Sequence, residues 1–312
     1  MTITRRELGK LVLTAPAAAL LPRELFAQAR PKPSSKWAGV QVGLNVPYNY
    51  GSRTLSAAET LERTLQLGVN AVEMRSQPIE LAMGAPAAAV AGGRGDAAKI
   101  AAANLRDWRL KTDPKSAAAV RKQYGDAGVL IDVVKFDGIY DFTDPEMDYA
   151  FGLAKATGAR AISCELEHDG TKRVGQFADK HKFPVAYHGH TKTPTEMFEE
   201  TFAQAKYNWA NIDIGHWVAG GLGSPVEMIR KHHERITHIH VKDRKKPEGG
   251  ADGPNTPFGQ GDTPIKEVLH LIRDNKWPIQ ATIEFEYPVP QGSDRMTEIA
   301  KTVQYCKDAL LA

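Results

Sequence analysis

Histidine and carboxylate side chains recur through the second half of this 312-residue chain, each near the end of a short apolar run. Buried parallel strands are normally apolar throughout, so polar groups at these points need a reason. The residues concerned are Glu165, Glu167, His188, His190, Asp213, His216, His238, His240, Lys242, Asp243, Glu284 and Glu286. Imidazole and carboxylate ligands from separate strands hold a borderline divalent cation while leaving positions open for a substrate. The pattern therefore predicts a metal site.

Several of these residues form pairs two positions apart, and such positions share one face of a strand. The pairs are His188 with His190, His238 with His240, and Glu284 with Glu286. We expect both members of each pair to point into one cavity. The expected metal ligands are His188, Asp213, His240 and Glu284, with Glu165 as an alternate that joins or replaces His188.

Short apolar runs alternate with helical patterns from Trp37 onward, which is the arrangement of βα units around a parallel sheet. The expected strands are Gly39–Val46, Ala71–Arg75, Val129–Lys135, Ala159–Glu165, Pro184–His188, Ala210–Ile214, Ile236–Lys242 and Thr282–Glu286. Eight parallel strands in a chain of this length favour a closed (β/α)8 TIM barrel, an α/β fold, over an open sheet. The polar residues would then converge at one mouth of the barrel.

Helices are expected between the strands, and two irregular stretches are expected to be loops. The helices are Ala57–Leu67, Ser116–Ala127, Pro145–Ala156, Thr195–Lys206, Pro225–Arg230 and Ile265–Asn275. Met83–Asn104 is rich in alanine and glycine without a clean period, which predicts a long loop. Pro247–Pro264 holds five glycines after the seventh strand, which predicts an active-site loop.

Five segments in the second half of the chain follow one another at the predicted strand ends. They are Tyr187-His188-Gly189-His190, Asp213-Ile214-Gly215-His216, His238-Ile239-His240-Val241-Lys242-Asp243, Pro257-Phe258-Gly259-Gln260-Gly261 and Ile283-Glu284. Together they resemble the successive motifs of the sugar phosphate isomerase/epimerase superfamily, the xylose-isomerase-like barrels. The similarity extends from about Trp37 to the end of the chain.

The resemblance implies a divalent metal, commonly manganese, cobalt, magnesium or zinc, which binds neighbouring hydroxyl and carbonyl oxygens of a sugar. Asp213, His240 and Glu284 match the superfamily's metal-ligand positions. Ketose 3-epimerases carry a glutamate on the fifth strand as ligand and proton-transfer group, whereas His188 stands here. The inosose dehydratase branch also reads Tyr-His-x-His on that strand, so the resemblance argues against a simple two-glutamate epimerase.

The chemistry that the resemblance implies takes place beside a carbonyl. A C–H bond beside a ketone becomes acidic enough only when the developing enediolate is stabilised, which a metal does as a Lewis acid. The role of base is open to His190, His216 or Glu284, and Lys242 is a candidate to stabilise charge or protonate a departing oxygen. The residues expected to contact substrate are Glu165, Trp217, Lys242 and Glu286, and Tyr48, Trp209 and Trp217 are candidates to stack on a sugar ring.

The shared intermediate leaves several functions open. We expect an isomerase or epimerase that acts on a sugar or keto-sugar. The alternative is β-elimination, by a 3-keto-glycoside lyase or an inosose-type dehydratase, and an alternative of another class is a noncatalytic sugar-binding barrel. A DNA-repair endonuclease barrel shares the pattern of Asp213 and His216, but a net charge of +3 from scattered basic residues argues against a nucleic-acid partner.

The first 29 residues resemble a twin-arginine export signal, with paired arginines, an apolar run and an Ala27-Gln28-Ala29 cleavage site. We therefore expect a signal peptide over residues 1–29, a linker over 30–36 and one catalytic barrel over 37–312. The protein would be exported by the twin-arginine machinery to the periplasm or beyond. The apolar run is shorter than the ~20 residues that a membrane anchor needs. Cys164 and Cys306 are expected to be unpaired core thiols.

Overall fold

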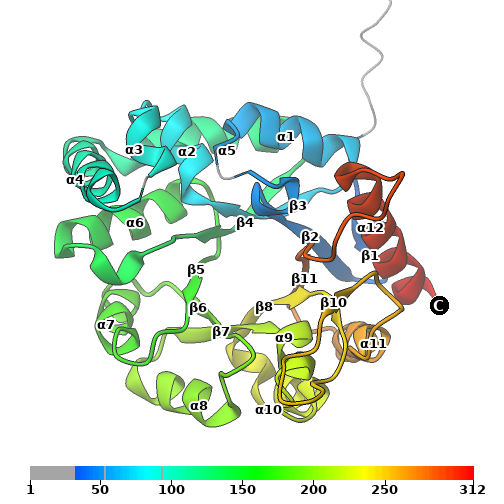
Figure 1. The fold of residues 1–312 in the computed structure, drawn as a ribbon. Helices are drawn as coiled ribbons and strands as arrows, with labels where there is room; N and C mark the ends of the chain where they lie inside the picture. Colours follow the sequence, from blue (N-terminus) through cyan, green and yellow to red (C-terminus); the bar gives the residue numbers. More distant parts are fainter. Residues whose placement is uncertain (1–31, 53, 93) are drawn as a thin grey trace, which may run out of the picture. The chain divides into compact units, whose positions relative to one another are not determined.

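Eight parallel strands follow one another around a closed barrel (Figure 1). They are β2 (Val40–Val46), β3 (Ala71–Arg75), β4 (Leu130–Lys135), β5 (Ala161–Glu165), β6 (Val185–His188), β7 (Asn208–Asp213), β8 (Ile236–Val241) and β11 (Gln280–Ile283). Each strand pairs with the next, and β11 pairs with β2, which closes the ring. The side chains of these strands are almost all buried, as expected for a barrel covered by helices. The predicted (β/α)8 barrel is confirmed.

The computed structural model describes residues 32–52, 54–92 and 94–312, and Pro33–Ala312 form one compact unit. The predicted signal peptide over residues 1–29 lies outside the described residues. Part of the predicted linker belongs to the barrel, because Ser35 is buried and its hydroxyl donates to the Val42 carbonyl at 2.7 Å. The two-residue strand β1 (Lys36–Trp37) then pairs antiparallel with β2. In the described part of the chain, no helix has the length and apolar content to cross a membrane.

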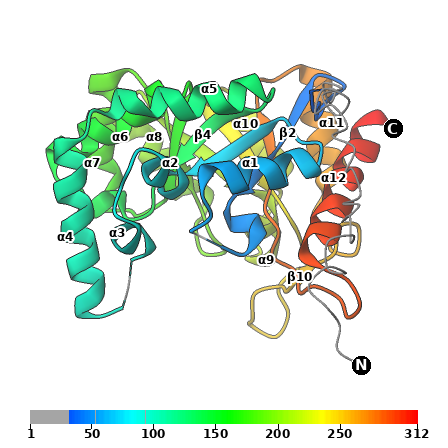
Figure 2. The same ribbon diagram turned by 90° about the horizontal axis from the view of Figure 1, so that it is seen from above.

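Helices surround the barrel on the outside (Figures 1 and 2). The longer ones are α1 (Ala57–Gln66), α4 (Asp96–Lys111), α5 (Ala118–Asp126), α6 (Asp144–Ala156), α7 (Thr171–His181), α8 (Thr195–Gln204), α10 (Pro225–His232), α11 (Ile265–Asn275) and α12 (Arg295–Leu311). Shorter elements are α2 (Ser76–Ala82), α3 (Ala87–Ala91), α9 (Ile214–Ala219) and the 3-10 turns η2 (Tyr48–Tyr50), η3 (Pro114–Ala117), η4 (Ile139–Asp141) and η5 (His233–Arg235). Ser56 forms a capping box with Glu59 at the start of α1, as the sequence around it favours.

The predicted loop over Met83–Asn104 is wrong, because α3 and most of α4 lie there. Helix α4 buries only Ala101 and Arg109, so it carries no apolar stripe that a periodicity could detect. Its alanine content favours helix by intrinsic propensity instead. The last strand also differs from prediction, since β11 ends at Ile283 and leaves Glu284 and Glu286 on the segment that follows it.

The loop after β8 is held to the barrel mouth by Asp243. This residue begins the small strand β9 (Asp243–Arg244), which pairs with β10 (Asn255–Thr256). The Asp243 carboxylate accepts hydrogen bonds from the backbone N–H groups of Gly259 at 2.7 Å and Gly261 at 2.9 Å. A Cβ atom on Gly261 would lie 1.9 Å from that carboxylate, so only glycine permits the approach. Figure 2 shows β10 and α9 at the same edge of the barrel.

Candidate functional site

Half of the polar residues predicted at the strand ends line one cavity of about 160 Å³ at the carboxyl ends of the barrel. This is the face on which TIM barrels carry their active sites. The lining side chains are Tyr48, Arg75, Lys135, Glu165, His188, His190, His216, Glu284 and Glu286. Of the three predicted pairs, His188 with His190 and Glu284 with Glu286 line this cavity, whereas His238 and His240 do not.

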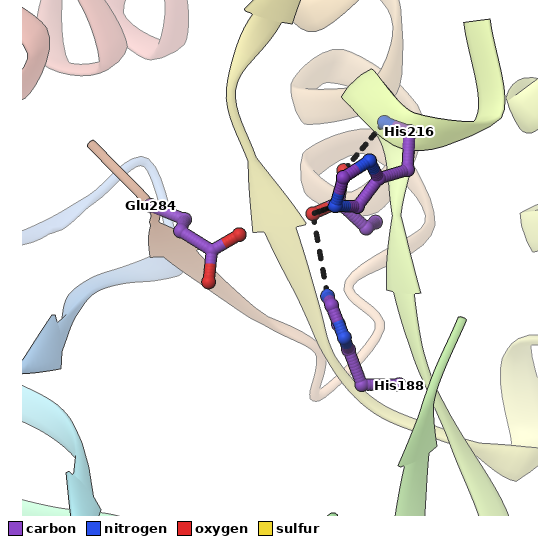
Figure 3. Close-up of side chains that lie close together, drawn as sticks. His188, His216 and Glu284 are labelled. Carbon is purple, nitrogen blue, oxygen red and sulfur yellow. Dashed lines mark hydrogen bonds and ion pairs between the residues drawn. The ribbon is translucent and has the colours of Figure 1, made fainter. Parts of the chain in front are cut away.

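Four side chains bring possible metal-ligand atoms together beside this cavity. One atom from each of His188, Asp213, His216 and Glu284 lies within 4.8 Å of the others. Figure 3 shows His188 and His216 on one side of the mouth, with Glu284 facing them from the other side. Asp213 is also the N-cap of α9, where it accepts the backbone N–H of His216 at 2.7 Å. Three of the four predicted ligands are thus neighbours, and His216 joins them.

The fourth predicted ligand, His240, lies deeper but faces the same group. Its Nδ1 atom is 3.3 Å from Glu284 Oε1 and 3.8 Å from Asp213 Oδ2. Among the described residues this buried nitrogen has no hydrogen-bond partner. Ligand atoms around a tetrahedral ion with bonds of ~2.1 Å lie about 3.4 Å apart. These spacings, and the 3.4 Å between His188 Nε2 and Asp213 Oδ2, fit a divalent cation.

His240 is oriented by a carboxylate, Glu73, that the sequence pattern does not single out. Glu73 on β3 is fully buried and pairs through Oε2 with His240 Nε2, while His238 Nε2 lies 3.4 Å from the same oxygen. Burial raises the pKa of Glu73, but the two imidazoles outweigh it and hold that pKa well below its usual value. Because Nε2 is taken by Glu73, Nδ1 is the His240 nitrogen left to face the cavity.

Glu165 and Lys135 hold His188 and His190 in the same manner. Glu165 Oε2 contacts His188 Nδ1 at 2.8 Å and His190 Nε2 at 2.7 Å, and Oε1 contacts the Lys135 ammonium at 2.6 Å. Burial is outweighed by these cationic and hydrogen-bonding neighbours, so the pKa of Glu165 lies far below normal. The hydrogen bond to Glu165 raises the pKa of His190. Glu165 thus contacts Nδ1 of His188 and leaves Nε2 directed toward Asp213.

Lys242 stands at the centre of the carboxylates. Its ammonium nitrogen lies 2.6 Å from both Glu284 Oε2 and Glu286 Oε2, and 3.0 Å from Asp213 Oδ2. Burial lowers the pKa of Lys242, but Asp213 and the two glutamates outweigh burial and raise it. The side chain is therefore held as a cation, and it contacts two carboxylates of the predicted ligand set, Asp213 and Glu284.

His216 sits between two cationic side chains. Its Nε2 atom is 3.0 Å from Lys242 Nζ, and its Nδ1 atom is 2.7 Å from Arg244 Nη1. Burial, opposed in part by Asp213, lowers the pKa of His216 to about 4. Both ring nitrogens already face neighbours, which limits the access of a substrate proton to this ring.

Of the three aromatic residues predicted to stack on a sugar ring, one lines the cavity and two do not. Tyr48 lines the cavity and donates its hydroxyl to Glu286 Oε1 at 2.7 Å. Trp217 is not at the cavity, because it is only 3% exposed and packs in the core with its ring centroid 6.2 Å from that of Phe198. Trp209 is likewise absent from the lining. The substrate contact predicted for Trp217 is therefore contradicted by its packing.

The first three strands supply site residues that sequence reasoning missed. They are Asn45, Glu73, Arg75 and Lys135. Asn45 on β2 donates to Glu284 Oε1 at 2.8 Å, and Arg75 pairs with Asp137 at the rim. The available signal was a charged residue inside the otherwise apolar runs that form β3 and β4.

Comparison with known proteins relates this geometry to one group of barrels. Residues 163–309 match the model of the family described as xylose isomerase-like TIM barrel. Over 192 residues, 55% of this chain and 58% of its relative, the chain is 26% identical to an inosose dehydratase of Clostridium botulinum. The chain spans about half the length of the curated relatives it matches. The resemblance predicted from the sequence is confirmed.

Solved structures share the fold over most of the chain. A xylose isomerase domain protein from Planctomyces limnophilus superposes with a TM-score of 0.60 at 15% identity, covering 88% of this chain and 97% of that one. The probable 3-DHS dehydratase AsbF of Bacillus anthracis gives a TM-score of 0.60 at 12% identity, covering 85% and 99%. At these identities the likeness concerns the fold alone.

Proposed function

We propose that this chain, a xylose isomerase-like TIM barrel, is a divalent-metal-dependent lyase that removes a β-substituent from a keto-sugar or keto-polyol. The observation that carries the proposal is the presence of two kinds of group at the carboxyl ends of the barrel strands. A histidine–carboxylate pair, His190 with Glu165, stands ready to remove a proton, and the Lys242 ammonium stands ready to give one. Elimination needs both at neighbouring carbons.

We assign a divalent cation to His188 Nε2, Asp213, His240 Nδ1 and Glu284, because the distances along this series of atoms are 3.4, 3.8 and 3.3 Å. When bound, such a cation polarises the substrate carbonyl as a Lewis acid and makes the neighbouring C–H acidic. Metal analysis of the purified protein would identify the cation among manganese, cobalt, magnesium and zinc. Lys242 keeps Glu286 as a carboxylate partner that is outside this ligand set.

His190 is the proposed base. Its Nε2 atom bonds to Glu165, its side chain is 57% exposed, and its other nitrogen has no bonded partner among the described residues. His216, by contrast, has both nitrogens against cations, and Glu284 is assigned to the metal. A carboxylate behind an imidazole orients it and supports the positive charge it gains on taking a proton.

The electron flow is a β-elimination. His190 takes the proton from the carbon beside the carbonyl, the C–H electron pair forms the new C=C bond, and the bond from the β-carbon to oxygen breaks. The departing oxygen takes a proton from Lys242, which is left as a neutral amine against Glu284 and Glu286. The products are an unsaturated ketone and water or an alcohol.

Elimination is favoured over isomerisation and epimerisation, which the sequence alone placed first. An epimerase of the two-glutamate kind needs a glutamate at the end of the fifth barrel strand, and His188 stands there with its Nδ1 bound to Glu165. The relatives named inosose dehydratase support the same choice. The alternative of a noncatalytic sugar-binding barrel is disfavoured by a cavity lined with groups that transfer protons.

The test is to incubate the metal-loaded protein with an inosose, a 3-keto-glucoside and a set of ketoses. A lyase releases water or the aglycone and yields a conjugated ketone with ultraviolet absorbance, whereas an epimerase changes a stereocentre and loses nothing. His190→Asn should lower elimination by about 10²–10⁴-fold, the usual contribution of a general base. His232→Asn is the matched control, because His232 forms a similar pair with Glu199 on the outer helices. Turnover of ketoses without elimination would overturn the proposal.

We propose further that the protein is exported, on the strength of the twin-arginine pattern in residues 1–29. Export would expose the enzyme to free sugars and glycosides more than to phosphorylated metabolites. Replacing Arg5 and Arg6 with lysine should leave the enzyme in the cytoplasmic fraction. An unchanged periplasmic yield would remove this part of the proposal.

A further inference from the structure

A second, larger space opens beside the catalytic cavity. This outer pocket has a volume of about 410 Å³ and is lined by Tyr48, Ser52, Asn255, Phe285, Glu286 and Arg295. These residues lie on the segments that follow β2, β8 and β11, so the outer pocket is on the catalytic face. Tyr48 and Glu286 line both spaces, which makes the two pockets neighbours across a shared wall.

The shared wall is tied directly to the proposed proton donor. Glu286 accepts from the Tyr48 hydroxyl through Oε1 at 2.7 Å and from Lys242 through Oε2 at 2.6 Å. The Arg75 guanidinium carbon lies 5.1 Å from the Tyr48 ring centroid, which supports the ring from another strand end. A group in the outer pocket would therefore lie against Glu286, the carboxylate that binds the proposed proton donor Lys242.

The volumes of the inner cavity and the outer pocket indicate ligands of different size. Pockets for larger organic ligands have volumes of ~300–1,000 Å³. The inner cavity of about 160 Å³ falls below this range and suits one small ring. The outer pocket of about 410 Å³ lies within it. A substrate confined to one ring would leave the larger space to solvent.

The lining of the outer pocket offers both donors and acceptors. Arg295 donates to the Asn49 carbonyl at 3.1 Å and stacks 5.0 Å above the Phe285 ring centroid, and no carboxylate in the described part of the chain pairs with it. Ser52 and Asn255 add a hydroxyl and an amide side chain to the lining. Glu286 adds negative charge on the opposite wall. A hydroxyl group both donates and accepts, so a neutral polyhydroxylated group suits this mixture better than an anion.

We infer that the outer pocket is a subsite for a second, neutral hydroxylated ring, so that the substrate is a glycoside with its reacting keto ring in the inner cavity. This inference rests on the proposed lyase function and narrows its substrate class. The second ring is then the leaving alcohol, placed against Glu286, which binds Lys242, when the C–O bond breaks. The outer pocket makes a glycosyl leaving group, and not only water, part of the reaction.

The experiment measures binding without turnover. Isothermal titration of the metal-loaded protein compares methyl glucoside with the two-ring sugar cellobiose and with cellobiouronic acid, its anionic counterpart. We expect cellobiose to bind about tenfold more tightly than methyl glucoside, the gain of one or two additional hydrogen bonds. Cellobiouronic acid should bind no better than cellobiose.

Two substitutions in the outer pocket test whether this space produces the preference. Ser52→Trp fills the pocket, and Arg295→Ala removes the unpaired guanidinium; either should bring the ratio of the two affinities to about one. Ser116→Trp is the matched control, because Ser116 is exposed at η3 on the outside of the barrel. Thermal melting checks that each variant is folded.

Each outcome decides the matter. Equal binding of one-ring and two-ring sugars, or an unchanged ratio in both variants, overturns the subsite. If cellobiouronic acid binds more tightly than cellobiose, the inference of a neutral second ring is wrong and the subsite binds an acidic group. The lyase proposal fails separately, when neither an inosose nor a 3-keto-glucoside undergoes elimination, whatever the binding ratio.

Discussion

Two buried charge clusters in this molecule are built on opposite principles. The helix cluster joins α2, α4 and α6 through Glu80, Arg106, Arg109 and Glu146. Its two acids face two arginines, and both oxygens of each carboxylate are bonded. The mouth cluster holds five carboxylates, Glu73, Glu165, Asp213, Glu284 and Glu286, against two lysines, Lys135 and Lys242, and Arg75, which also pairs with Asp137.

The difference lies in what each cluster leaves unpaired. At the mouth, buried atoms such as Glu73 Oε1, Asn211 Oδ1 and His240 Nδ1 lack hydrogen-bond partners in the described part of the chain. Such atoms cost free energy in a folded protein, and buried charge in excess of its partners costs more. A balanced cluster stabilises the fold by itself. We propose that an unbalanced one, rich in acid, is completed by a cation from outside.

The largest expected effect is on activity, at the mouth. Glu284→Gln removes one charge that the metal and Lys242 both use, so elimination should fall by about 10³-fold or more. Folding stability should change little, because the substitution also relieves an excess of buried negative charge. Steady-state kinetics with metal analysis and a thermal melt measure both. A variant that loses stability and keeps its activity would show that the mouth cluster, like the helix cluster, mainly stabilises the fold.

The second prediction applies the same comparison to the helix cluster. Arg109→Ala leaves Glu80 buried and unpaired, which should cost about 3–5 kcal/mol in free energy of unfolding. Elimination per folded molecule should be unchanged, since Arg109 lies on α4 outside the barrel. Urea unfolding and activity at low temperature test this. Arg106→Ala is the milder control: its side chain is 40% exposed, and the loss should be about 1 kcal/mol.

How much of each cluster the sequence predicts depends on the kind of signal. Apolar runs with polar ends locate the strands and bring His188, Asp213, His240 and Glu284 to one mouth. Glu73 gives no such signal, because a single acid inside a strand shows neither spacing nor its partner His240, 167 residues away. The sequence does not predict the helix cluster for another reason. Helix α4 buries only two residues, so a periodic pattern indicates neither the helix nor the role of Arg109.

The third prediction concerns metal affinity, which distinguishes a cation site from a cluster balanced within the chain. Added divalent cation should stabilise the protein by ~2.7 kcal/mol at one hundred times its dissociation constant. Glu73→Gln should weaken metal binding by about 10–100-fold, as loss of a carboxylate behind a ligating histidine does. Titration with Co²⁺ reports affinity and, through its visible spectrum, the ligand geometry. Glu80→Gln is the control, with destabilisation but unaltered cobalt affinity.

The smallest expected effect is a dependence of stability on pH in the helix cluster. Burial raises the pKa of Glu146, but hydrogen bonds from Thr143 and Arg106 outweigh it and lower the pKa below 4.5. The stability that the carboxylate adds is therefore present above pH 4.5 and is lost as pH falls through the lowered pKa. Glu146→Gln should cost about 1 kcal/mol at pH 7, and less as the wild-type carboxylate becomes protonated. Urea unfolding of both proteins at pH 7 and below pH 4 measures the difference. A gap that widens in acid would show that the Glu146 charge destabilises the fold, and the contrast between the two clusters would then be one of position and not of balance.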